Sequence, residues 1–268
     1  MDDALFLKKL KGNRFFEDLK YIFSRIKHEA SLHRVRIILV LNPRSSQAKN
    51  VEREVLQPIN QYIFAQRKTS KVTILKFEVL PTDVDDNAEK LADILRDEDV
   101  MLTIGGDGTA TIGVNAAFLS GKKILYYTIP YGNFNDIART VRKARGEKVF
   151  ALEARVNDEH FRFAMCYFTV GMFAKSTEIF DESRIRERLR KRKKNLFFSL
   201  FELFKWFIVN RRQRFIPEFK YEIDTKPRER LEHRKASDII ALNGVSMARI
   251  LKGGEYFKGR TFLLRVAS

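Results

Sequence analysis

The segment Met101-Leu102-Thr103-Ile104-Gly105-Gly106-Asp107-Gly108-Thr109 carries the strongest structural signal in the sequence. Four residues with the pattern of a buried strand lead directly into three glycines around an aspartate, and a helical pattern follows at once. Glycines let the backbone approach a ligand closely and adopt positive φ angles. Backbone N–H groups at the start of a helix then form an anion site. The segment therefore predicts a strand–loop–helix unit that binds phosphate groups.

Two side chains in this loop have several possible roles. Thr109 can cap the helix or donate its hydroxyl to a phosphate. Asp107 would repel phosphates unless it meets Mg²⁺ or takes a proton from an attacking hydroxyl. The alternative is a tight turn that needs glycine, in which Asp107 only caps a helix.

Strand and helix patterns alternate on both sides of the loop. The predicted strands cover 35–41, 72–80, 99–104 and 123–129, and the predicted helices cover 50–67 (interrupted near Pro58), 83–96, 109–119 and 134–144. This alternation predicts a mostly parallel sheet covered on both faces. From about residue 148 the segments 149–156, 160–170, 218–224 and 237–243 resemble strands, as in a β-rich second domain.

Residues 1–34 are predicted to form a basic helical extension before an α/β domain at 35–147. The apolar residues recur at helical spacing: Phe15, Phe16, Leu19, Ile22, Phe23 and Ile26. Such a helix can pack on the main domain or anchor the protein at a membrane surface, and we favour packing.

Composition limits the function classes. The chain has 268 residues, with 51 basic against 34 acidic residues and a formal net charge of +17, which favours polyanions such as nucleotides, nucleic acid or an anionic membrane face. The single cysteine, Cys166, excludes an internal disulfide framework and is expected to be buried. No secretory signal pattern and no run of about 18 apolar residues is present. We therefore expect a cytoplasmic protein, peripheral at the inner membrane face.

Several families of kinases share the glycine pentapeptide, so its flanks discriminate between them. They are Asn42-Pro43-Arg44-Ser45-Ser46 after the first strand, Thr82 after the second, and Pro130-Tyr131-Gly132-Asn133-Phe134-Asn135-Asp136-Ile137-Ala138-Arg139. Further along come Tyr167-Phe168-Thr169-Val170-Gly171-Met172-Phe173-Ala174 and Asn243-Gly244. In this order the motifs resemble those of the diacylglycerol kinase catalytic-domain family of lipid kinases, from about residue 35 onward.

The resemblance implies a fold and a site. The fold would be an α/β nucleotide-binding domain joined to a β-rich, sandwich-like lipid-substrate domain (148–268), with the active site in the cleft between them. ATP and Mg²⁺ would be the cofactors and a lipid the acceptor. The candidate ATP-binding residues are Asn42, Pro43, Arg44, Ser45, Ser46, Thr82, Gly105, Gly106, Asp107, Gly108, Thr109, Asn133, Asn135 and Asp136, with Asp107 also the candidate catalytic residue. For Asn135 and Asp136, helix capping alone is an equal alternative.

The sequence departs from the family pattern at four places. Ser46 replaces a glycine, Asn133 replaces a threonine, and Lys258-Gly259 stands where many bacterial members have an Asp-Gly pair that holds Mg²⁺. The ammonium group of Lys258 is our candidate for replacing that charge. The family's late Asp-Gly-Glu, whose glutamate is the proposed base, is absent before Ser268, as in a shortened C-terminus. A catalytically inactive nucleotide- or membrane-binding paralogue is therefore the alternative to an active kinase.

A basic and aromatic segment spans residues 184–215. Basic residues from Arg184 to Lys194 precede the apolar run 196–209, which is too short to span a bilayer. The run can form a helix packed on the second domain, or an interfacial helix whose flanking Lys and Arg side chains meet anionic lipid. Nucleic-acid binding is the least favoured explanation of the positive charge, because no recognised nucleic-acid-binding motif accompanies the basic residues. The sequence predicts no oligomeric state.

Overall fold

A computed structural model of the protein describes residues 3–44, 48–66, 72–132, 135–143, 151–156, 159–171, 174, 201, 205, 238–242 and 263–267. The chain divides into two compact units, Met1–Met165 and Cys166–Ser268. This division falls after the boundary at 147 that the sequence suggested, and the domain limits themselves stay predictions.

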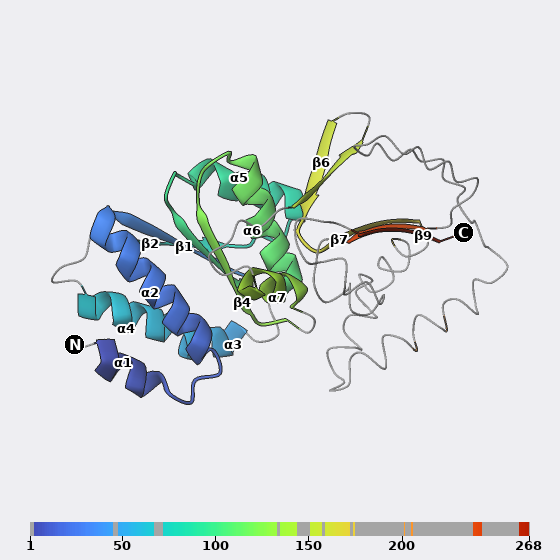
Figure 1. Ribbon diagram of the computed structural model, residues 1–268. Helices are drawn as coiled ribbons and strands as arrows, with labels where there is room; N and C mark the ends of the chain where they lie inside the picture. The colour runs from blue at the N-terminus through green and yellow to red at the C-terminus, as the bar shows by residue number, and fades with distance from the viewer. Residues whose placement is uncertain are drawn as a thin grey trace. The chain divides into compact units, whose positions relative to one another are not determined.

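The first unit is built on a parallel four-stranded sheet (Figure 1). Its strands are β1 (Val35–Leu41), β2 (Val72–Glu78), β3 (Val100–Gly105) and β4 (Leu125–Pro130), in the spatial order β2-β1-β3-β4. Every residue of β3 is buried, as expected for an inner parallel strand with both faces covered. The predicted parallel α/β architecture is confirmed.

Two helices pack on one face of the sheet. They are α5 (Val84–Ile94) and α6 (Asp107–Leu119), which Figure 1 shows side by side. Ile38 and Val40 of β1 and Met101 of β3 meet the apolar stripe of α5 there, including Leu91. This face forms a buried core directly behind the glycine loop.

The opposite face is covered by the N-terminal helices and by the helix after β1 (Figure 1). This layer contains α1 (Asp3–Leu10) and α2 (Phe16–Leu32). It also contains the segment after β1, which forms α3 (Ala48–Val51), the π-helical turn η1 (Glu52–Leu56) and α4 (Gln57–Gln66). The rings of Phe23 and Tyr62 stack 4.3 Å apart between α2 and α4.

The structure tests two expectations for this face. The apolar side of α2, including Leu19, Ile22 and Ile26, is fully buried, so the membrane-anchor interpretation of this helix is wrong. The helix predicted at 50–67 is interrupted near Pro58, as predicted: the i+5 bond from Gln57 to Glu52 closes a π turn, and Pro58 lies in the first turn of α4. A missing N–H is tolerated at that position.

The strand predicted at 160–170 is two strands. Strand β6 (Glu159–Ala164) pairs antiparallel with β5 (Leu152–Val156), and after a bend the chain enters β7 (Tyr167–Gly171). Cys166 lies in this bend and is buried, as predicted. Strands β5 and β6 belong to the first unit, in which β6 packs against α6.

The second unit contains a three-stranded antiparallel sheet of β7, β8 (Asp238–Leu242) and β9 (Leu263–Ala267). Strand β8 was predicted and β9 was not. The predicted strand at 218–224, Asn243-Gly244, Lys258-Gly259 and nearly all of the segment 184–215 lie outside the described residues. A β-rich second domain as a whole therefore stays a prediction.

Candidate phosphate-binding site

The sheet order defines where a ligand can bind. The chain moves from β1 outward to β2 and then returns past β1 to β3, so the strand order reverses between β1 and β3. In open α/β sheets ligands bind outside the carboxyl ends of the strands at such a switch point. The two loops at this point are the turn after Leu41 and the glycine loop after Ile104, because these residues pair in the sheet. Both were selected from the sequence as candidate nucleotide contacts.

The glycine loop lies directly against the loop that follows β4. The Tyr131 amide donates to the Gly105 carbonyl oxygen over 2.7 Å. A Cβ atom placed on Gly132 would come within 2.6 Å of the Gly106 Cα atom. A larger residue at Gly132 would push the two backbones apart, so the two motifs predicted separately form one structural unit.

Asn135 shapes the second loop from within. Its Oδ1 accepts the Gly132 amide at 2.8 Å and its Nδ2 donates to the Gly132 carbonyl at 2.7 Å. Its φ angle of 54° is in the left-handed region, where asparagine is tolerated better than most residues. Asn135 therefore holds a tight turn just before α7 (Asp136–Lys143).

Helix α6 begins within the glycine loop. Its first residue is Asp107 and its N-cap is Gly106, which has no side chain to satisfy the first backbone amides. Such amides attract anions. Thr109 lies inside the helix and is therefore not its N-cap, so the capping role considered for it is wrong. Its Oγ1 would lie 2.5 Å from a Cβ on Gly105, and Thr109 is buried against that glycine.

Asp107 caps a helix, but not its own. Its Oδ1 accepts the backbone amide of Ile137 at 3.1 Å, in the first turn of α7. Burial raises the pKa of the Asp107 carboxyl above its usual value, and the charge of Asp136 adds to this, while the amide bond from Ile137 acts in the opposite direction. One carboxylate thus connects the starts of α6 and α7, and its negative charge faces two helix N-termini.

The turns after β1 and β2 are connected by an arginine. Asn42 accepts the Arg44 amide at 3.0 Å, which forms an Asx turn that includes Pro43. The Arg44 guanidinium donates to the Leu80 carbonyl at 2.5 Å, and Thr82 accepts from Asn87 at 2.8 Å. Arg44 and Thr82 are exposed.

The predicted site residues are thus placed as follows. At the carboxyl ends of the parallel strands, in the last strand residue, the following loop or the first turn of the next helix, lie Asn42, Pro43, Arg44, Thr82, Gly105, Gly106, Asp107, Gly108, Thr109, Asn135 and Asp136. Ser45, Ser46 and Asn133 lie outside the described residues. Sequence reasoning missed the bonds from the Ile137 amide to Asp107 and from the Tyr131 amide to Gly105, for which the chain gives no local signal.

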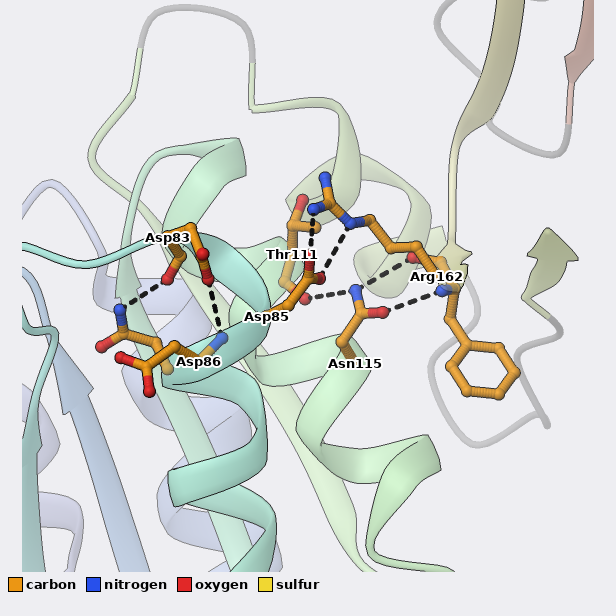
Figure 2. Close-up of polar contacts among 8 residues, drawn as sticks. Asp83, Asp85, Asp86, Thr111, Asn115 and Arg162 are labelled. Atoms are coloured by element: carbon orange, nitrogen blue, oxygen red, sulfur yellow. Dashed lines mark hydrogen bonds and ion pairs between the residues drawn. The ribbon is translucent and has the colours of Figure 1, made fainter. Parts of the chain in front are cut away.

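A polar cluster beside this edge attaches β6 to the helices (Figure 2). Arg162 donates to both carboxylate oxygens of Asp85, at 3.0 and 2.5 Å. Asn115 of α6 accepts the Phe163 amide at 2.8 Å and donates to the Phe163 carbonyl at 3.0 Å. These bonds extend the first unit beyond the parallel sheet.

Figure 2 also shows the start of α5, where Asp83 caps the helix by accepting the Asp86 amide at 2.8 Å.

Within the described residues, no group of three or more His, Cys, Asp or Glu side chains could hold a metal ion. In the same part of the chain, no helix is long and apolar enough to cross a bilayer.

The first unit is thus a parallel α/β domain with a glycine loop at the switch point of its sheet. Residues 36–167 match the family model of the diacylglycerol kinase catalytic domain, and this part of the chain belongs to that family. The resemblance seen in the sequence motifs is confirmed there.

Solved structures from Bacillus anthracis str. Sterne are similar in fold. A putative diacylglycerol kinase shares 17% identity and a TM-score of 0.51 over 86% of this chain and 75% of that chain. A diacylglycerol kinase shares 16% identity and a TM-score of 0.49 over 87% of this chain and 73% of that chain. At these identities the likeness concerns the fold alone. No curated protein matches the sequence.

Proposed function

We propose that the protein transfers the γ-phosphoryl group of ATP to the hydroxyl of a lipid, diacylglycerol or a related one, at an anionic membrane surface. One observation carries the proposal. In a segment that matches a kinase catalytic domain, the glycine loop packs on the Gly132 loop at the reversal point of the sheet. The first amides of α6 then support the phosphates, and the Asn42–Arg44 turn borders the same edge.

The reaction requires one proton acceptor. The lipid hydroxyl oxygen forms a bond to the γ-phosphorus, the bond from that phosphorus to the β–γ bridging oxygen breaks, and ADP leaves with the electron pair. The hydroxyl proton passes to a carboxylate. Asp107 is our candidate, because its partly buried carboxyl has a raised pKa and lies in the glycine loop.

Magnesium would neutralise the phosphate charge during transfer. Among the described residues, Asp107 and Asp136 offer carboxylates close to the loop, since both border the start of α7. One or two carboxylates and the nucleotide phosphates are a usual set of ligands for this ion.

The capping bond of Asp107 supports the second candidate, an inactive nucleotide- or membrane-binding paralogue. A carboxylate that accepts the Ile137 amide can be retained for structure alone. In that case the protein would bind ATP and transfer nothing.

Transfer of labelled γ-phosphate from Mg-ATP into a total lipid extract separates the two. We expect one labelled lipid with the native protein, none with Asp107→Asn, and an unchanged yield with Asp93→Asn, which alters an exposed carboxylate of α5. ATP binding without any labelled lipid would establish the inactive paralogue instead. Absence of ATP binding by the folded protein would refute the kinase and leave only the membrane-binding form of the paralogue.

A further inference from the structure

The N-terminal helices reach the candidate site although they precede the matched family segment, which begins at residue 36. The connection between α1 and α2 contacts Tyr131, the residue before Gly132, through the ring of Phe15. We propose that Tyr131 is a positioning residue, through which the α1–α2 connection and the π-helical turn hold the β4–α7 loop against the glycine loop. This inference rests on the proposed ATP-dependent function.

Tyr131 is bonded at both ends. Its backbone amide donates to Gly105 at 2.7 Å, and its hydroxyl donates to Glu54 Oε2 at 2.7 Å. Glu54 belongs to η1, the π-helical turn after the β1 loop. Burial raises the pKa of the Tyr131 hydroxyl, and the bond to Glu54 raises it further, so the hydroxyl stays a proton donor at physiological pH. Isolated π-helical turns are frequent at functional sites.

The chain between α1 and α2 covers the same ring. The rings of Phe15 and Tyr131 lie 4.7 Å apart, and the Arg14 guanidinium carbon lies 5.8 Å from the Tyr131 ring centroid. Asn13 donates from Nδ2 to the Glu54 carbonyl at 2.8 Å. Tyr131 is only 3% exposed. The Tyr131 side chain is therefore held by two contacts, one with the ring of Phe15 and one with the carboxylate of Glu54.

These two contacts of Tyr131 affect the backbone at Gly132, which supports the glycine loop. The next residue, Gly132, lies against the Gly106 backbone, and Gly106 caps the helix whose amides face the ligand. A displacement of Tyr131 therefore moves the support of the glycine loop. Glu54 and Tyr131 are 77 residues apart in the sequence, so only the fold brings them together.

The test is Tyr131→Phe, which removes one hydroxyl and keeps the ring. We expect the Kd and the KM for Mg-ATP to rise by about tenfold, which corresponds to about 1.4 kcal/mol. We expect kcat to fall less than KM rises, because the reacting groups remain in place.

Glu54→Ala should raise the Kd for Mg-ATP to the same extent, whereas Glu54→Gln keeps an oxygen acceptor and should restore most of the affinity. The double variant Tyr131→Phe, Glu54→Ala should be no weaker than either single variant.

Tyr127→Phe is the matched control. It removes a buried tyrosine hydroxyl of β4 that also donates to a carboxylate, Asp18, at 2.8 Å, away from the glycine loop. We expect it to lower the Tm and to leave the Kd for Mg-ATP unchanged. A Kd that is unchanged in Tyr131→Phe, or raised equally in both variants, would overturn the positioning role while the native protein still binds ATP. Absence of ATP binding by the native protein would instead refute the proposed function, and the inference with it.

Discussion

At the scale of single residues, one methyl group at position 132 should separate the two loops. In Gly132→Ala the new Cβ would lie 2.6 Å from the Gly106 Cα atom and 2.9 Å from Asn135 Oδ1. Backbone must move to relieve such contacts, and overpacking of this kind costs about 1–3 kcal/mol. We expect a lower free energy of unfolding in urea and a weaker affinity for ATP.

Gly108→Ala is the contrasting change in the same loop. A Cβ at Gly108 meets nothing within 4 Å, and the residue lies in the first turn of α6. Gly→Ala at a compatible helical position stabilises by about 0.4–1 kcal/mol. Equal losses of stability in the two variants would show that the close packing of Gly132 against Gly106 is not the cause of the destabilisation.

Asp107 should link stability to pH. Its carboxyl has a raised pKa in the folded protein, because burial disfavours the charge. The folded state therefore binds the proton more tightly than the unfolded state, and this stabilising contribution, complete below the unfolded pKa, is lost as pH rises through the folded pKa. Asp107→Asn carries no such charge and can still accept the Ile137 amide. We expect the variant to be more stable than the native protein in urea at pH 7, with the difference shrinking towards pH 4. A difference independent of pH would contradict this account.

At the scale of elements, α2 and α7 are joined by a buried carboxylate. Asp18 accepts bonds from Tyr127 of β4 and from the Nε and Nη2 atoms of Arg142. Asp18→Ala leaves both donors without this acceptor. The free energy of unfolding should fall by somewhat less than the ~3–5 kcal/mol that removing one partner of a fully buried ion pair costs, because 38% of the Arg142 side chain is exposed. Thermal unfolding should show a marked fall in Tm, whereas Lys90→Ala, which removes an exposed pair with Asp86 on α5, should hardly change it.

The inner strands β1 and β3 could be predicted because burial on both faces leaves apolar runs. Strand β1 follows Val35–Leu41 as predicted, and α6 begins two residues earlier than predicted, since Asp107 is already helical. Strand β9 was missed, because Leu263–Ala267 is short and contains the charged residue Arg265. The bend at Cys166 was missed because no glycine or proline marks it.

The loops of the candidate site could be predicted from the sequence, but their contacts could not. Glycines at a strand end indicate a phosphate loop whatever its surroundings. The bonds from Ile137 to Asp107 and from Tyr131 to Glu54 join residues 30 and 77 positions apart. Such pairs depend on how the strands are ordered, and neither residue type carries a local signal for them.

At the scale of the whole molecule, the net charge of +17 should attract the protein to anionic membranes. Each basic residue near such a surface contributes about 1 kcal/mol, and salt screens the attraction over about 10 Å at 0.1 M ionic strength. We expect sedimentation with vesicles that contain phosphatidylserine, weakening as salt rises, and little with neutral phosphatidylcholine vesicles. Binding that is equal for both kinds of vesicle would contradict an electrostatic role.

The aromatic segment should add an apolar part to this binding. Phe201 lies in the basic and aromatic segment, and 55% of its surface is exposed, which favours the interfacial hypothesis over core packing at that position. An exposed phenylalanine flanked by basic residues can enter the headgroup layer. Phe201→Ser should therefore weaken binding to anionic vesicles several-fold at high salt, where the electrostatic part is screened. The matched control is Phe64→Ser, because Phe64 on α4 is 70% exposed and lies outside the aromatic segment. Equal effects of the two variants would mean that general surface hydrophobicity, and not this segment, meets the membrane.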